Sequence, residues 1–205
     1  MKHPQVIGID FDNTIVHYDH LFYRLALEQD LIPAVFSQNK TSIRDYIRTL
    51  EDGESKWICL QALAYGSRIL EAQMAEGFIE FAQQVKKAGF VLCIVSHKTE
   101  YPSRGEQVNL REAALHWMDS NNFFNGSGLN LDSQTDVFFE STRDEKMNRI
   151  RQKQCDYFID DLIEFLMDPL FPNDVKRLHY SKQKSEQVPF SNFETWLAIE
   201  NYFLA

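Results

Sequence analysis

The sequence has few cysteines and no cluster of lysine and arginine. Cys59, Cys93 and Cys155 are far apart and lie in apolar segments, an odd and scattered set that is typical of reduced core residues rather than of disulfides or zinc ligands. We therefore expect a cytoplasmic location. The formal net charge is −9, whereas binding to nucleic-acid phosphates requires a dense basic patch. The composition argues against a nucleic-acid partner and favours a small substrate.

Long apolar runs, internal repeats and low-complexity tracts are also missing. The longest apolar run is far shorter than the roughly 20 residues that cross a membrane, so we expect no membrane partner. The first predicted strand begins at Val6, so we expect no signal peptide. The 205 residues suffice for one core with a small insertion but hardly for two full domains. The oligomeric state has no signature in the sequence.

Hydrophobic patterns predict strands that alternate with helices along most of the chain. The predicted strands cover 6–11, 90–96, 136–140, 157–161 and 175–180, and the predicted helices cover 69–88, 107–121, 142–152, 162–167 and 192–205. Strands that alternate with helices through short connections form parallel sheets with helices on both faces. The sequence therefore predicts an α/β fold with a doubly wound parallel sheet.

A helical segment separates the first two predicted strands. Helical patterns cover 18–30, 40–51 and 54–66, and no strand pattern interrupts them. Their apolar positions recur at helical spacing, so these helices can pack as a unit of their own. We predict a small helical cap at 18–65, inserted into a core domain formed by 1–17 and 66–205. The alternative is that these helices cover one face of the sheet.

Acidic residues follow two of the predicted strands. Asp10 lies at the end of the first and Asp12 directly after it, and Asp160 and Asp161 end the fourth. The carboxyl ends of parallel strands meet at one edge of a sheet, where α/β proteins bind their ligands. Like charges held so close together require a proton or a cation between them, and a divalent cation is the expected one.

Four segments together resemble the motifs of the haloacid dehalogenase-like (HAD) hydrolase superfamily, in particular its phosphatases. They are IGIDFDNT, IVSHK, a lysine that opens a helix at position 146, and YFIDD. The resemblance extends from Val6 to Leu166. The glycine that commonly follows the second aspartate is Asn13 here, a change that leaves the pattern intact.

The resemblance implies a role for each motif residue. Asp10 is the expected nucleophile, Asp12 the general acid and base, and Lys146 the catalytic lysine. The residues expected to hold phosphate are Thr14, Ser96, His97 and Lys146. The implied cofactor is Mg²⁺, with Asp10, Asp12 through its backbone carbonyl, Asp160 and Asp161 as the residues around it. Asp161 either binds the metal, directly or through water, or caps the following helix.

These inferences predict a magnesium-dependent phosphatase that hydrolyses a small phosphomonoester through a phosphoaspartate. The alternatives are another phosphoryl transfer, such as a phosphomutase reaction, and a catalytically idle binding protein with the same fold. A phosphonate hydrolase would need a Schiff-base lysine in the cap, for which Lys40 and Lys56 are candidates by location only. Loop residues near the predicted site favour a sugar or nucleoside as the leaving group: His17, Tyr18, His97, Lys98, Tyr101 and Arg104.

Overall fold

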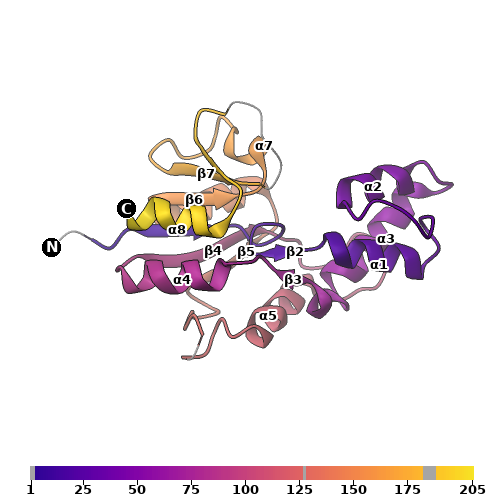
Figure 1. Cartoon of the computed structure of the whole chain (residues 1–205), viewed down its shortest axis with the longest axis horizontal. Coiled ribbons are helices and arrows are strands. Elements are labelled where there is room, and N and C mark those ends of the chain that lie inside the picture. Colours follow the sequence, from indigo (N-terminus) through magenta and orange to yellow (C-terminus); the bar gives the residue numbers. More distant parts are fainter. Residues whose placement is uncertain (1–2, 127, 182–187) are drawn as a thin grey trace. The chain divides into compact units, whose positions relative to one another are not determined.

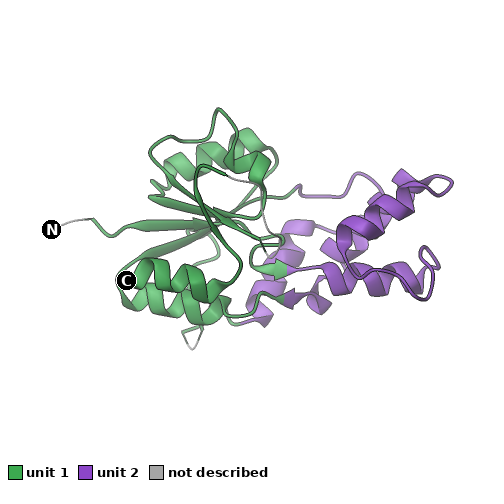
Figure 2. Ribbon diagram, turned by 45° about the horizontal axis from the view of Figure 1, so that its top comes forward, with its two compact units in different colours: residues 1–16, 74–98, 122–205 green, residues 17–73, 99–121 purple. Residues whose placement is uncertain are grey.

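The protein divides into two compact units, which Figure 2 colours separately. The computed structural model describes residues 3–126, 128–181 and 188–205. Unit 1 consists of Met1–Val16, Met74–Lys98 and Asn122–Ala205, and unit 2 consists of His17–Gln73 and Thr99–Asn121. No helix within the described ranges is long and apolar enough to cross a membrane.

Unit 1 is built on a parallel sheet, which has six strands within the described residues. The strands are β1 (Val6–Ile9), β4 (Val91–His97), β5 (Val137–Glu140), β6 (Tyr157–Asp160), β7 (Lys176–Tyr180) and β8 (Ser191–Phe193). Their order is β5-β4-β1-β6-β7-β8, and every neighbouring pair is parallel. The chain thus builds the sheet outward from β1 in both directions, and the strand order reverses between β1 and β6. Ligands of such sheets bind at this reversal, beyond the carboxyl ends of the strands.

Helices cover both faces of this sheet. They are α4 (Phe78–Lys87), α6 (Arg143–Gln152), α7 (Ile163–Leu166) and α8 (Trp196–Leu204). The ring of Tyr157 on β6 lies 4.8 Å from that of Phe203 on α8, and the ring of Phe158 lies 6.0 Å from that of Phe165 on α7. Adjacent strand residues point to opposite faces, so α7 and α8 lie on opposite sides (Figure 1). The predicted doubly wound fold is confirmed.

Two of the predicted helices differ most in length from the helices of the structure. Instead of a helix over 69–88, the chain forms a 3₁₀ turn at Ile69–Glu71, the short strand β3 (Gln73–Met74) and then α4. Gly77, with a φ of 82°, precedes α4 in a left-handed conformation that interrupts a helix. The C-terminal helix begins at Trp196 because the side chain of Thr195 caps it, and the residues before Thr195 form the edge strand β8.

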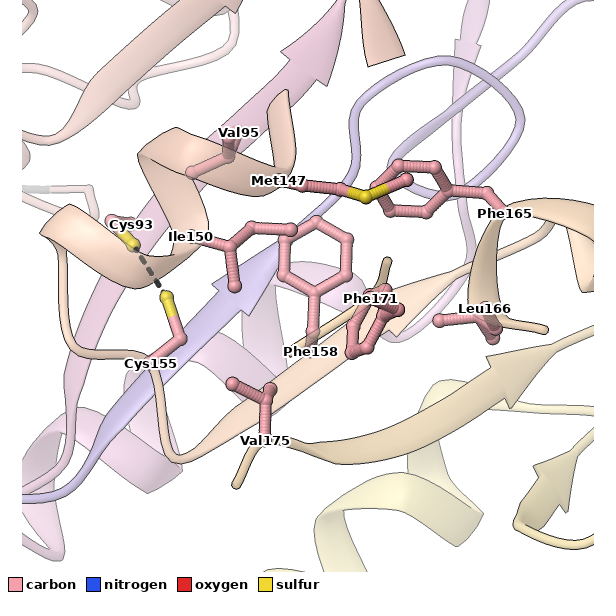
Figure 3. Packing of buried hydrophobic residues seen from close by; sticks show 10 residues of the cluster. All are labelled: Cys93, Val95, Met147, Ile150, Cys155, Phe158, Phe165, Leu166, Phe171 and Val175. Carbon is pink, nitrogen blue, oxygen red and sulfur yellow. Dashed lines mark hydrogen bonds between the residues drawn. The ribbon is translucent and has the colours of Figure 1, made fainter. Parts of the chain in front are cut away.

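The core beneath α6 and α7 brings two cysteines together (Figure 3). The sulfur atoms of Cys93 and Cys155 are 3.8 Å apart, and all three cysteines are free thiols. Gly8 on β1 makes room for this arrangement, because a Cβ there would lie 2.9 Å from the Cys155 sulfur and 2.7 Å from the Phe158 ring. The hydrogen bond with Cys93 and burial both raise the pKa of the Cys155 thiol. The Cys155 thiol therefore stays protonated within the core.

Unit 2 is helical and has its own core. It contains α1 (Asp19–Glu28), α2 (Lys40–Arg48), α3 (Gly53–Tyr65) and α5 (Leu110–Ser120). The rings of Phe22 and Trp57 stack 4.9 Å apart between α1 and α3. The indole of Trp117 on α5 donates to the carbonyl of Ala72 at 3.0 Å. Unit 2 therefore contains the whole predicted insertion, 18–65, and in addition α5, which the sequence analysis assigned to the core domain.

Candidate active site

The turn after β1 starts the site. The backbone N–H of Asp10 donates to the carbonyl of Ile159 at 2.9 Å, which extends the β1–β6 pairing by one residue. The chain then folds back through a tight turn in which Ile15 and Val16 donate to the carbonyl of Phe11. Asn13 adopts a φ of 63° in this turn, a left-handed conformation that glycine and asparagine accept most readily. This explains why asparagine replaces the glycine that is common at this position.

Asp10 is buried and paired with a buried lysine. The Nζ of Lys146 lies 2.6 Å from Oδ1 of Asp10 and 2.7 Å from Oδ2 of Asp160. Burial raises the pKa of Asp10 to about 6, against the opposing effect of the Lys146 charge. Burial alone would lower the pKa of Lys146, but the two carboxylates raise it above its usual value. The lysine is therefore a permanent cation at the carboxyl edge of β1 and β6.

Helix α6 delivers Lys146 to this position. Thr142 caps the helix in a capping box: its side chain accepts from the N–H of Glu145 at 3.1 Å, and the Glu145 side chain accepts from the N–H of Thr142 at 3.0 Å. Lys146 lies one residue later, near the positive end of the helix dipole, where a cation is disfavoured unless an anion is close. Asp10 and Asp160 supply that anion. The Nζ also lies 4.3 Å from the centre of the Phe165 ring.

Two hydroxyl side chains also contact Asp10. The Oγ of Ser96, on β4, donates to Oδ1 of Asp10 at 2.8 Å, and the Oγ1 of Thr14 lies 3.5 Å from Oδ2. Both side chains are buried. Ser96 and Lys146 therefore converge on the same carboxylate oxygen from two different elements. Their predicted role in phosphate binding stays a prediction.

Three carboxylates lie close enough to share a metal ion. Asp10, Asp160 and Asp161 each offer an oxygen, and these oxygens lie within 4.8 Å of one another. Mg²⁺ prefers oxygen ligands, and all three residues offer carboxylate oxygens. The donor set therefore fits magnesium. The N-cap of α7 is Leu162 and not Asp161, and the N–H of Leu162 donates to Oδ1 of Asp160 at 2.8 Å.

Asp12 is held by a lysine that the sequence analysis placed in a substrate loop. The Nζ of Lys98 lies 2.8 Å from Oδ2 of Asp12, and the Lys98 side chain is buried. Residues two apart on a strand point to the same side, so Lys98 follows Ser96 to the face on which Asp10 lies. This spacing was the signal that could have identified Lys98. The charge of Asp12 contributes to the raised pKa of Asp10, which places the two carboxylates near each other.

Two other predicted residues have different surroundings. His97, between Ser96 and Lys98, is exposed, and its Nε2 lies 2.9 Å from the carbonyl of Ser141. Its role as a phosphate ligand stays a prediction. In unit 2, the Nζ of Lys40 lies 5.3 Å from the centre of the Phe22 ring and 5.4 Å from that of Tyr65. The Schiff-base role of Lys40 stays a prediction.

Comparisons with known proteins identify the fold. No protein-family model matches the sequence, and no curated protein is significantly similar to it. A haloacid dehalogenase-like hydrolase from Streptococcus pneumoniae superposes with a TM-score of 0.63 and 16% identity over 98% of both chains. YfnB of Bacillus subtilis, described as a HAD hydrolase bound to magnesium, gives 0.60 and 13% over 100% of both chains. The chain has the fold of the HAD-superfamily hydrolases.

A further neighbour with the HAD fold carries a more specific description. It is a predicted phosphoglycolate phosphatase from Haemophilus somnus, with a TM-score of 0.58 and 11% identity over 98% of this chain and 99% of that one. In the HAD fold of the present chain, the four motif segments meet at the carboxyl edge of β1, β4 and β6. The sequence analysis located these segments, and the structure adds the contact between Lys98, in the second of them, and Asp12.

Proposed function

We propose that the protein is a magnesium-dependent phosphatase that hydrolyses a small phosphomonoester through a phosphoaspartate at Asp10. The observation that carries this proposal is the buried contact of Asp10 with Lys146 and Ser96, next to Asp160. A carboxylate is a nucleophile only when ionised, and Lys146 provides the positive charge that favours ionisation against burial. The same cation is available to a dianionic phosphate.

The proposed reaction has two displacements at phosphorus. A carboxylate oxygen of Asp10 attacks phosphorus, the bond to the leaving oxygen breaks, and Asp12 donates a proton to that oxygen. Water then attacks the phosphoaspartate, the bond between phosphorus and Asp10 breaks, and Asp12 accepts the proton from the water. Lys98 holds the carboxylate of Asp12 through both steps, since its Nζ contacts both Asp12 oxygens at 2.8 and 3.1 Å.

Asp10, Asp160 and Asp161 would hold the magnesium ion, with the backbone carbonyl of Asp12 as a further ligand. Magnesium neutralises charge on a transferring phosphoryl group and helps to orient it. Lys146 adds a second positive charge, fixed by two carboxylates. Preorganised charge of this kind stabilises a transition state without reorganisation during the reaction.

The helical insertion is proposed to select the leaving group. The chain enters unit 2 at His17, three residues after Thr14, and again at Thr99, directly after Lys98. Both connections therefore start from segments that carry site residues. Substitution of exposed polar residues within 18–65 should change the preference among natural esters more than the hydrolysis of a small generic ester. If all esters are affected equally, the insertion has no role in specificity.

The free thiols agree with the predicted cytoplasmic location.

The proposal is tested with a panel of phosphorylated sugars, nucleotides and a generic aryl phosphate. We expect release of inorganic phosphate from at least one metabolite with Mg²⁺, loss of release in chelator, and recovery on adding Mg²⁺. The Asp10→Asn variant should be folded and inactive. Transfer of the phosphoryl group within the substrate, without phosphate release, would instead indicate a mutase. Absence of turnover on every ester would support a binding protein and contradict the proposal.

A further inference from the structure

A buried histidine outside the proposed reaction contacts the backbone of the metal cluster. His179 lies on β7, opposite Asp160 of β6 on one side and Asn192 of β8 on the other. Only 2% of its surface is exposed. Its Nε2 lies 3.0 Å from the carbonyl oxygen of Asp161, and its Nδ1 lies 2.6 Å from the side-chain oxygen of Asn192. The side chain thus connects β8 to the turn that follows β6.

The chemistry of these partners fixes one end of the imidazole ring. A carbonyl oxygen only accepts hydrogen bonds, so Nε2 of His179 must carry a hydrogen and donate it to Asp161. The other end is adaptable, because the amide of Asn192 can accept through its oxygen or, turned over, donate through its nitrogen. The bond to Asp161 therefore holds in either protonation state of Nδ1.

This bond adds one more constraint to a turn that is already held tightly. Oδ2 of Asp160 accepts from Lys146 at 2.7 Å, and its Oδ1 accepts from the N–H of Leu162 at 2.8 Å. These bonds hold the Asp160 carboxylate and the residue after Asp161. The bond from His179 holds the other end of the same peptide group, at the carbonyl of Asp161. Rotation of that peptide would redirect the Asp161 side chain away from the oxygens of Asp10 and Asp160.

We propose that His179 is a positioning residue for the metal cluster, which it orders by donating Nε2–H to the backbone carbonyl of Asp161. The proposal rests on the proposed function, because it assigns His179 to the magnesium ligands named there. Mg²⁺ requires nearly ideal octahedral geometry, so a small displacement of one carboxylate weakens binding. Loss of an outer partner of a metal ligand typically weakens metal binding by about 10- to 100-fold.

Two amide substitutions separate the ends of the ring. In His179→Gln, the side-chain nitrogen can replace Nε2 and still reach the carbonyl of Asp161. In His179→Asn, the shorter side chain reaches only the region of Nδ1. Both are neutral amides of similar polarity, so they are matched in the cost of burial. We measure Mg²⁺ binding without substrate, by calorimetry, and the stability of each variant by thermal unfolding in chelator.

His179→Asn should weaken Mg²⁺ binding by about 10- to 100-fold, and His179→Gln should restore most of the affinity. Ile199→Ala is the control for reduced stability. Ile199 is buried on α8, on the face of the sheet opposite to α7. This variant should keep normal Mg²⁺ affinity, which shows that reduced stability alone does not weaken binding. Equal Mg²⁺ affinity in wild type and both His179 variants, or equal loss in both, would overturn the proposal. If the wild-type protein binds no Mg²⁺, both the proposed function and the proposed role of His179 are wrong.

A spectroscopic measurement on the wild-type protein does not depend on folding of the variants. Nitrogen-15 NMR should show Nε2 of His179 protonated, with a shift that moves on adding Mg²⁺, because the acceptor carbonyl belongs to a metal-binding residue. The ring of His116, exposed on α5 in unit 2, serves as the control and should not respond. An unprotonated Nε2, or a His179 signal unaffected by Mg²⁺ that does bind, would contradict the positioning role.

Discussion

Replacing Lys146 by methionine removes the only cation whose bonds to both Asp10 and Asp160 are seen among the described residues. Methionine has a similar length and no charge, so the change leaves two buried carboxylates without their partner. Removing one member of a buried ion pair typically costs about 3–5 kcal/mol. In a chain of this size, 1 kcal/mol shifts Tm by about 2–4 °C, which gives a loss of about 6–20 °C.

The size of this loss should depend on pH and on magnesium. At a pH well above 6, Asp10 is ionised and the loss in Tm is at its largest. Burial raises the pKa of Asp10 to about 6 even with the lysine present, so without the lysine that pKa lies higher still. As the pH falls toward 6, Asp10 of the variant therefore takes up a proton and its uncompensated charge disappears. Magnesium should also reduce the loss, since a bound cation replaces the charge of Lys146.

The assay is thermal unfolding of Lys146→Met and of a matched surface variant, Lys87→Met, in chelator and in saturating Mg²⁺. Lys87 is exposed on α4, and its replacement should change stability by no more than about 0.5 kcal/mol. If Lys146→Met unfolds at the same temperature as Lys87→Met in chelator at high pH, Lys146 is not the counterion of Asp10 and Asp160, and the argument from the buried pair is refuted.

Three further predictions concern the proton donor and the metal. Asp12→Asn should slow hydrolysis of an alkyl phosphate by about 10²- to 10⁴-fold. It should slow hydrolysis of an activated aryl phosphate much less, because an activated aryl leaving group needs no proton. Equal losses on both esters would exclude Asp12 as the general acid. Lys98→Met should also slow the alkyl ester more than the aryl ester, by a smaller factor, and Lys98→Arg should restore activity. If Lys98→Met hydrolyses both esters at wild-type rates, Lys98 has no role in the site. A protonated carboxyl is a poor metal ligand, and the pKa of Asp10 is about 6. Calorimetry should therefore show that Mg²⁺ affinity increases as the pH rises through 6 and levels off above it. A Mg²⁺ affinity independent of pH would show that Asp10 is not a ligand.

The sequence predicts the sheet well because buried parallel strands leave a plain pattern. The strands around Gly8, Val95 and Phe158 are continuous apolar runs that end in polar residues. Local geometry was harder to predict. The break before α4 depends on the left-handed conformation of Gly77, and glycine is also tolerated within helices. The edge strand β8 is only three residues long, too short for an alternating pattern to be recognised.

Partners that are distant in the sequence could not be predicted from local patterns. Lys98 was interpreted as a loop residue because it follows the predicted strand 90–96, but it is buried against Asp12. His179 on β7 contacts Asp161, which directly follows the neighbouring strand β6. No spacing rule connects the two positions. The division into units depends on which helices pack together: α5 follows β4 in the chain, yet it packs with the helices of unit 2. Such contacts are set by tertiary packing.

The central claim is that Asp10 bonds covalently to phosphorus, and rapid quenching tests it most directly. The protein is mixed with a substrate identified in the panel and Mg²⁺, quenched in acid during the first turnover, digested, and analysed by mass spectrometry. The account predicts a phosphoryl group on the peptide that contains Asp10, formed and lost at rates compatible with turnover and missing in Asp10→Asn. Turnover by a folded Asp10→Asn variant, or a phosphoryl group on a different residue such as Ser96, would contradict the account.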